Sequence, residues 1–460
     1  MKQFHKYIMS AALAFFAASC DYTDLTPTDQ IDDSMIFSSV DALEQTVNGA
    51  YGKMSVKQLI SVSAVLSDDV SKGGQNGGAG DDTFQWTYTT STGDHTSVWS
   101  SYYGVINEVN RILKGSESVT PADKDEEVRK NNCIGTAKYL RAYNALQLLL
   151  FFSDIENMDS YGIPYTKEPV VLETPGRNSV KECFDYMITD LNEARPLLSA
   201  ATPENPAYVS QTAVDALLAR IYLYMHDYKN AYNLAENAIK AVPVAGMDSY
   251  EGIWSDENNT DIIWKLKRFT GQETIGTIFW QGDNSSSFEA SEEIINSYPD
   301  GDIRKDIFTG KGPDREGVIV NRVNKYKGTP ENVGLADGKM LRASEMKLIM
   351  VEAKARTEGG LNEANKLLNE FRAQRIEDWT DKTYSSEEIL DEILLERRRE
   401  LCYEGHRFFD MRRFGKDMTK PTIKKTLEKG NFRWLMPIPL AELQGNPEIA
   451  KQQNPGYSNY

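Results

Sequence analysis

The sequence has few of the residues that most often carry enzyme chemistry. Its 460 residues include only four histidines and four cysteines. The histidines form no H-E-x-x-H motif and no other close spacing typical of a metal site. Neither a G-x-S-x-G motif nor a Walker A loop occurs. We therefore expect no metal site, no cofactor and no catalytic role. A surface glycosidase stays open as a less favoured alternative, because its two catalytic groups are carboxylates, which are plentiful here.

Positive charge is also scarce. Lysine and arginine number 51 against 68 acidic residues, which gives a formal net charge of −17 and an isoelectric point near 4.9. An acidic surface disfavours non-specific binding of nucleic acid. The hydrophobic content of 40% is ample for a buried core. The length alone suggests one large domain or roughly two to three ordinary ones.

Long hydrophobic runs are absent except at the N-terminus. After a basic start, residues 7–18 are apolar. A run of about twelve residues is too short to cross a bilayer, which takes about 20, and it fits a secretory signal peptide. Small residues then precede Cys20, an arrangement that resembles a bacterial lipobox, although an ordinary signal peptide with a chance cysteine has the same pattern. We expect a lipoprotein signal peptide over residues 1–19, lipidation at Cys20 and a flexible tether over 20–36.

Three cysteines remain after Cys20, namely Cys133, Cys183 and Cys402. Their number is odd and their spacings match no metal motif. We expect buried thiols at all three positions, with one disulfide left open as an alternative.

Helix pairs account for much of the remaining pattern. In residues 211–242, small and apolar residues recur at helical spacing on both sides of a short turn, as in one tetratricopeptide unit. Three further pairs are predicted at uneven intervals: 133–155 with 181–198, 341–375, and 385–414. The chain is therefore mostly α, with about four such pairs, but it is no regular solenoid. A single helix is predicted over 99–113.

Irregular segments separate these pairs. Residues 67–86 are rich in glycine and should form a loop. Residues 243–340 alternate short β-like runs with polar loops, and the segment from Phe432 to the C-terminus should be mostly extended because it is rich in proline.

The stretch ERRRELCYEGHRFFDMRRFG, residues 396–415, contains six arginines. It is not a basic patch, because residues 387–413 contain eight acids against those six bases. Helical spacing brings oppositely charged residues together within this stretch: Glu396 with Arg399, and Arg397 with Glu400. We interpret the stretch as a partly buried ion-pair network that joins two helices, rather than as a site for phosphate or nucleic acid.

Five features resemble one family when they are taken in order along the chain. They are the lipobox, VWSSYYGVINEVNRIL, AKYLRAYNALQLLLFF followed by YGIPY, ILLERRRELCYEGHRFFDMRRFG, and MPIPLAELQGNPEIAKQQNPGY. Over nearly its whole length the chain resembles the SusD/RagB family of outer-membrane nutrient-binding lipoproteins of Bacteroidota.

The resemblance implies a mostly helical SusD-like fold in which about four tetratricopeptide-like helix pairs pack against a loop-rich face with short β-strands. It implies a single SusD-like domain over 37–460, with an N-terminal part of about 37–240 and a C-terminal part of about 250–460. It further implies a cell-surface lipoprotein, held in the outer membrane by its lipid, that acts as the lid of a SusC-like TonB-dependent transporter and binds an oligosaccharide or polysaccharide. Peptide binding, as in RagB-like members, and a structural lid with negligible affinity are the alternatives.

Candidate ligand-binding residues should lie in the variable loops. Sugar rings pack on aromatic faces, and their hydroxyls need planar polar groups. The candidates are Trp86, Asp68, Asp69, Asn76, Trp280 and Arg372. Each also has an ordinary structural interpretation, because tryptophan often packs in a core and aspartate often caps a helix or turn. Trp99 and Trp264 are assigned to the core.

Overall fold

The structure is a computed structural model that describes residues 36–170, 173–202 and 205–458. The predicted signal peptide, Cys20 and nearly all of the predicted tether lie outside the described residues. Within the described part, no helix combines the length and the apolar character needed to cross a membrane.

A layer of long helices forms the N-terminal part. Its helices are α3 (Val40–Lys53), α4 (Val56–Leu66), α6 (Gly93–Ser116), α7 (Lys124–Phe152) and α8 (Val180–Ala194). The side chain of Asp123 caps the first turn of α7, where three further acidic residues favour the positive end of the helix dipole. The last turns of α7 are buried on all sides, because α6, α8 and the C-terminal segments enclose them.

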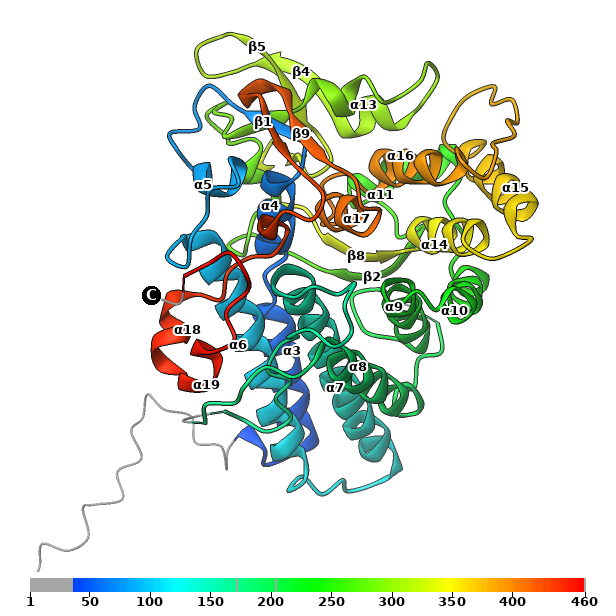
Figure 1. Cartoon of the computed structure of the whole chain (residues 1–460). Helices are drawn as coiled ribbons and strands as arrows, with labels where there is room; N and C mark the ends of the chain where they lie inside the picture. Colours follow the sequence, from blue (N-terminus) through cyan, green and yellow to red (C-terminus); the bar gives the residue numbers. More distant parts are fainter. Residues whose placement is uncertain (1–35, 171–172, 203–204, 459–460) are drawn as a thin grey trace, which may run out of the picture.

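The four predicted helix pairs are present, and the predicted mostly helical fold is confirmed. They are α7 with α8, α9 (Gln211–Tyr224) with α10 (Tyr228–Ala241), α14 (Ala343–Ala355) with α15 (Leu361–Arg372), and α16 (Ile389–Leu401) with the short α17 (Arg407–Arg413). The buried face of α10 consists of Ala231, Ala235 and Ala238, so that α9 and α14 approach it closely. Figure 1 shows these pairs stacked along the lower and right-hand sides of the molecule.

Short strands form five antiparallel pairs among the described residues. They are β1 (Val70–Lys72) with β3 (Phe288–Ala290), β2 (Ile262–Leu266) with β8 (Gly338–Arg342), β4 (Thr309–Pro313) with β5 (Ile319–Val323), β6 (Gly328–Thr329) with β7 (Asn332–Val333), and β9 (Met418–Lys420) with β10 (Lys425–Leu427). Trp264 of β2 is fully buried, with its ring centroid 5.1 Å from the rings of Tyr139 and Tyr143 of α7. These contacts join the strands to the helical layer. The assignment of Trp264 and Trp99 to the core is confirmed.

Short helices and turns complete the chain. They are α5 (Asp81–Phe84), η1 (Arg195–Leu197), α11 (Met247–Trp254), η2 (Ile275–Ile278), α12 (Glu292–Ile295), α13 (Arg304–Phe308), η3 (Pro421–Ile423), η4 (Phe432–Trp434), α18 (Leu440–Gly445) and α19 (Pro447–Ala450). Two sequence predictions differ from this. The glycine-rich segment contains β1 and α5, and the C-terminal segment is not mostly extended. Its helix α19 forms because Asn446 accepts hydrogen bonds from the amides of Glu448 and Ile449.

All three described cysteines are free and buried, as predicted. Burial raises the pKa of each of the three thiols to about 12.

His95, near the start of α6, should make the fold sensitive to mild acid. Its side chain is buried, and burial lowers the pKa of its imidazole to about 4. Between pH 6.5, the ordinary pKa of histidine, and pH 4, the unfolded chain therefore binds a proton at His95 that the folded chain does not. The stabilisation of the fold by the neutral His95 side chain is complete above pH 6.5 and is lost as the pH falls towards 4. We expect His95 to account for about 2 kcal/mol of lost stability between pH 7 and pH 5.

Urea unfolding at both pH values tests this prediction. His95→Phe should reduce the pH dependence of the free energy of unfolding by that amount. An unchanged dependence in His95→Phe would remove His95 as its source.

Candidate ligand-binding face

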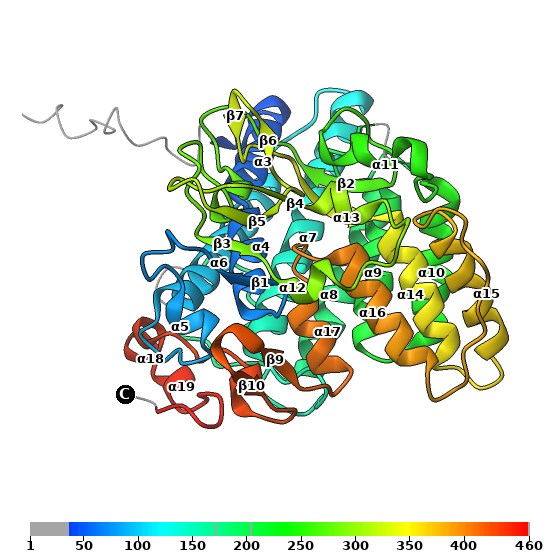
Figure 2. The ribbon, with the colours of Figure 1, turned by 90° about the horizontal axis from the view of Figure 1, so that it is seen from above.

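A loop-rich face lies away from the helix pairs. The segment after α4, the strands β1 and β3, the turn η2 and the β4–β5 hairpin converge there. Figures 1 and 2 both show β1, β4 and β5 grouped on one side, with α10, α14 and α15 on another, and Figure 2 shows β3 between β1 and β5. The helix pairs and the loop-rich face are thus segregated, as the family resemblance implied.

A stacked pair of side chains marks this face. The guanidinium carbon of Arg322, on β5, lies 3.3 Å from the ring centroid of Trp280. Both side chains are half-buried. Arg322 pairs with Gly310 of β4, and its side chain crosses over Gly312, two positions further along that strand, where a Cβ would lie 2.4 Å from the guanidinium carbon. Within the described residues no carboxylate pairs with Arg322, and burial lowers the pKa of its guanidinium. The group therefore keeps donors that a ligand oxygen can accept from.

A hollow of about 280 Å³ lies on the same face, and Trp280 is adjacent in sequence to one of its walls. Its polar lining includes Lys57 and Ser61 of α4, Asp94 of α6, Thr277 and Gln281. Its apolar lining includes Val62, Val65, Ile278 and Phe288. Lys57 donates to the Thr277 hydroxyl over 3.3 Å, and Asp94 accepts from the Thr83 hydroxyl. Donors and acceptors over an apolar floor are what a sugar ring needs.

The glycine-rich loop forms one wall of this hollow. The amide of Gly73 donates to the Ser287 carbonyl over 3.0 Å, and a Cβ on Gly73 would lie 2.2 Å from the Ser286 oxygen. Gln75 reaches the hairpin and donates to the Asp314 carboxylate over 2.9 Å. The loop is therefore tied to β3 and to the β4–β5 hairpin, and only glycine allows that close approach.

Trp86 does not lie on this surface. Its ring is 4% exposed, and its indole NH donates to the Leu66 carbonyl over 2.9 Å. The ammonium of Lys420 lies 4.5 Å from its ring centroid. The sequence prediction that Trp86 offers an aromatic face to the ligand is therefore corrected, because α4 and β9 cover the ring.

Asp68, Asp69 and Asn76 are also buried, and all three are committed to protein partners. Asp68 accepts two hydrogen bonds from Arg407, over 2.8 and 2.9 Å, and Asp69 accepts from Arg398 over 2.8 Å. Burial opposes ionisation of Asp68, but the two arginines outweigh it and hold its pKa well below the ordinary value. The Asn76 carboxamide bonds to its own loop and to the Ser287 carbonyl. In this structure none of the three is available to a ligand.

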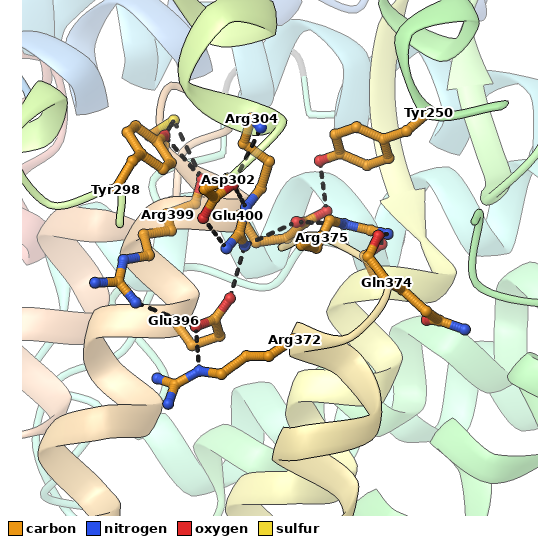
Figure 3. Close-up of polar contacts among 12 residues, drawn as sticks. Tyr250, Tyr298, Asp302, Arg304, Arg372, Gln374, Arg375, Glu396, Arg399 and Glu400 are labelled. Atoms are coloured by element: carbon orange, nitrogen blue, oxygen red, sulfur yellow. Dashed lines mark hydrogen bonds and ion pairs between the residues drawn. The ribbon is translucent and has the colours of Figure 1, made fainter. Parts of the chain in front are cut away.

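Arg372 is equally inaccessible. It is 1% exposed and pairs with Glu396 over 2.7 Å and with Glu392 over 2.9 Å. Figure 3 shows its side chain directed at Glu396, which Arg304 and Arg399 also contact. Trp280 is thus the one predicted candidate that the structure leaves partly exposed. Arg322, Lys57 and Gln281 could not be predicted from the sequence, because no local pattern shows which side chains of a hairpin and a helix share a face.

The arginine-rich stretch is an internal ion-pair network, as predicted. The Glu396–Arg399 pair is present at 3.5 Å. The predicted pair of Arg397 with Glu400 is wrong: Arg397 pairs with Asp410 over 2.8 Å. Glu400 instead lies 2.8 Å from Arg342 of β8. It also lies 3.1 Å from Arg375 and 3.3 Å from Arg304, which come from other elements (Figure 3). The network is fully rather than partly buried at Glu396 and Glu400.

Two family models match the chain. The SusD family model matches residues 262–457, and a model described as starch-binding and associating with the outer membrane matches residues 21–223. SusD-like protein P2 of Formosa agariphila is 22% identical over 95% of this chain and 97% of its own length.

Solved structures agree with these matches. A SusD superfamily protein from Bacteroides thetaiotaomicron superposes with a TM-score of 0.79 at 23% identity, covering 91% of this chain and 100% of its own. A SusD-like carbohydrate binding protein from Bacteroides vulgatus has a TM-score of 0.77 at 20% identity, covering 92% and 99%. The helix pairs, the loop-rich face and these matches in both halves of the chain lead to one conclusion: this protein belongs to the SusD family.

Proposed function

We propose that this protein is a cell-surface glycan-binding lipoprotein, anchored in the outer membrane through Cys20, which captures an oligosaccharide for a SusC-like TonB-dependent transporter. The Trp280–Arg322 stack on the loop-rich face is the observation that carries the proposal. A family described as starch-binding and outer-membrane-associated supports it, as does the fold shared with a carbohydrate binding protein.

The chemistry of the face suits a hydroxyl-rich ligand. Arg322 offers a planar set of donors, Lys57 a further donor, and Asp94 and Gln281 offer acceptors. The aromatic ring of Trp280 provides apolar contact for the carbon face of a sugar. We expect the ligand to bridge the stack and the hollow, since Trp280 and Gln281 follow one another along the chain.

Replacing Trp280 with alanine tests the site. We expect the dissociation constant for the glycan to rise about tenfold or more. An aromatic contact contributes about 1.4 kcal/mol, and losing that much binding free energy raises a dissociation constant about tenfold. Arg322→Ala should cause a similar loss. Isothermal titration against a panel of polysaccharides and peptides provides the measurement, with melting temperatures recorded for each variant.

Trp379→Ala is the matched control. Trp379 is also half-buried with cationic neighbours, Arg372 at 5.4 Å and Lys382 at 5.1 Å from its ring, but it follows α15 on the scaffold. Its loss should leave glycan affinity unchanged. Tight binding of peptides without any response to glycans would overturn the proposal in favour of a RagB-like role, and new reducing ends released from a bound glycan would establish a glycosidase instead.

A further inference from the structure

A second pocket lies outside the loop-rich face. It occupies about 590 Å³ between α6, α18 and the described residues of two short stretches, 164–170 and 173–175. We refer to it as the α6–α18 pocket; it is lined by Trp99, Ser100, Tyr103, Gly104, Asn107, Pro164, Thr166, Val170, Glu173, Thr174, Pro175, Glu442, Gly445 and Asn446. In Figures 1 and 2, α18 lies well apart from the β4–β5 hairpin. Its volume falls within the range of about 300–1,000 Å³ typical of ligand pockets.

Two aromatic side chains line the pocket in a fixed arrangement. Trp99 and Tyr103 are one turn apart on α6, with ring centroids 4.7 Å apart. The Tyr103 hydroxyl donates to the Pro164 carbonyl over 3.0 Å, and the edge of Phe152 supports Trp99 at 4.9 Å. Trp99 is largely buried, as Trp86 is, but Trp99 borders a cavity and Tyr103 beside it is more exposed. The pair is therefore already placed for contact with a ligand.

Polar groups surround these aromatic rings. The Glu442 carboxylate accepts from the indole NH of Trp99 over 3.3 Å and from the Asn446 amide over 3.2 Å. These two donors orient it, and a carboxylate retains further acceptor capacity for hydroxyl groups. The pocket lining contains the acids Glu173 and Glu442 but no lysine or arginine. This charge balance favours a neutral ligand over an anionic one.

A glycine keeps the pocket open. Gly104 lies inside α6, where glycine destabilises a helix relative to alanine. It is exposed, and a Cβ at this position would meet nothing within 4 Å. Packing therefore does not require glycine there, but a larger side chain would enter the space beside Trp99 and Tyr103. Gly445, at the end of α18, borders the pocket in the same way.

We propose that the α6–α18 pocket is a second saccharide site, which takes a neutral mono- or disaccharide unit. Aromatic contact would come from Trp99 and Tyr103, and the hydroxyls would donate to Glu442. The inference rests on the proposed glycan-binding function but places an additional sugar contact outside the loop-rich face. A long glycan could then engage one protein at two separated points, which strengthens its capture.

Gly104→Trp tests the second site, because it fills the pocket without removing any lining group. The probes are maltose, cellobiose, xylobiose and lactose, titrated calorimetrically into the purified protein, with digalacturonate as an anionic control. We expect one or more of the neutral probes to bind, to retain affinity in Trp280→Ala, and to lose at least tenfold affinity in Gly104→Trp. Digalacturonate should not compete.

Two variants guard against misfolding. Gly104→Ala should keep full affinity and raise the melting temperature. Gly49→Trp places the same bulk on α3, at another exposed helical glycine with open space around it, and should leave binding unchanged. If Gly104→Trp binds the neutral probes normally, or if only Trp280→Ala abolishes their binding, the second site is refuted while the loop-rich face stands. If neither the probes nor the polysaccharide panel binds at all, both proposals fail.

Discussion

Glu400→Gln is expected to destabilise the fold by about 3–5 kcal/mol, enough to leave little folded protein. Glu400 is completely buried, and three guanidinium groups, those of Arg304, Arg342 and Arg375, lie within 3.3 Å of its oxygens. The Tyr250 hydroxyl donates to the same carboxylate over 2.8 Å. A neutral amide of the same shape keeps the packing but removes the charge that this cluster requires.

Most of the lost free energy of unfolding should come from Arg375, because it loses its ion-pair partner. Arg304 retains ion pairs with Asp302 and Glu396, and Arg342 retains those with Asp261 and Glu404. Arg375 is fully buried and its described ion pair is with Glu400. It keeps hydrogen bonds to neutral groups only, namely the Ala245 and Gln374 carbonyls and the Ser344 hydroxyl. Among the described residues, the variant therefore leaves the buried Arg375 guanidinium without a direct ion-pair partner.

Guanidinium unfolding measures this loss, with Glu387→Gln as the control. Glu387 is exposed just before α16, and its replacement should change stability by less than about 0.5 kcal/mol. Adding Arg375→Met to Glu400→Gln should restore part of the loss, because the second change removes the unpaired charge. A loss below about 1 kcal/mol in Glu400→Gln would contradict the importance of this cluster.

The pH provides a further readout of the same cluster. Burial opposes ionisation of Glu400, but its arginine neighbours outweigh burial and hold its pKa well below the ordinary value. With a folded pKa depressed in this way, the stabilisation is complete above about pH 4.5 and is lost as the pH falls below it. The difference in the free energy of unfolding between the parent protein and Glu400→Gln should therefore become smaller as the pH falls below about 4.5.

The helix pairs were predictable because their signal is local. Small and apolar residues at helical spacing define α9 and α10 within a single stretch of chain, and the structure places both there. The internal character of the arginine-rich stretch also followed from its own acids and bases. Its partners did not: Arg304, Arg342 and Arg375 approach Glu400 from distant segments. Pairing between segments depends on tertiary packing, which helical spacing does not encode.

The ligand-binding face was harder to predict for the same reason. A tryptophan beside a glycine-rich loop can either face a ligand or pack in the core, and its neighbours in sequence do not decide between the two. Trp86 is buried because residues far away in sequence cover it, among them Lys420. Arg322 reaches the ring of Trp280 from β5, whose position depends on its pairing with β4. Residue type therefore identified candidates, while the fold decided which of them reach the surface.

Asp68→Asn is expected to lower stability by about 3 kcal/mol without weakening glycan binding. Asp68 and Asp69 precede β1 and tie it to the scaffold through Arg398 and Arg407. Without the Asp68 charge, Arg407 loses its bidentate partner, and Asp69 is the ion-pair partner that Arg398 retains among the described residues. Arg407→Ala breaks the same pair and should also lower stability.

Thermal unfolding and glycan titration of the same Asp68→Asn protein distinguish two roles of Asp68: an ion pair that holds β1 to the helices, and a direct contact with the ligand. Exposed Asp381, changed to asparagine, is the control and should alter neither quantity. At a temperature where Asp68→Asn is folded, its glycan affinity should stay within about twofold of the parent, since a twofold change is only about 0.4 kcal/mol. The opposite outcome, lost binding at an unchanged melting temperature, would return Asp68 to the ligand site. Through these ion pairs, the position of β1 and of the loop-rich face depends on Arg398 of α16 and Arg407 of α17.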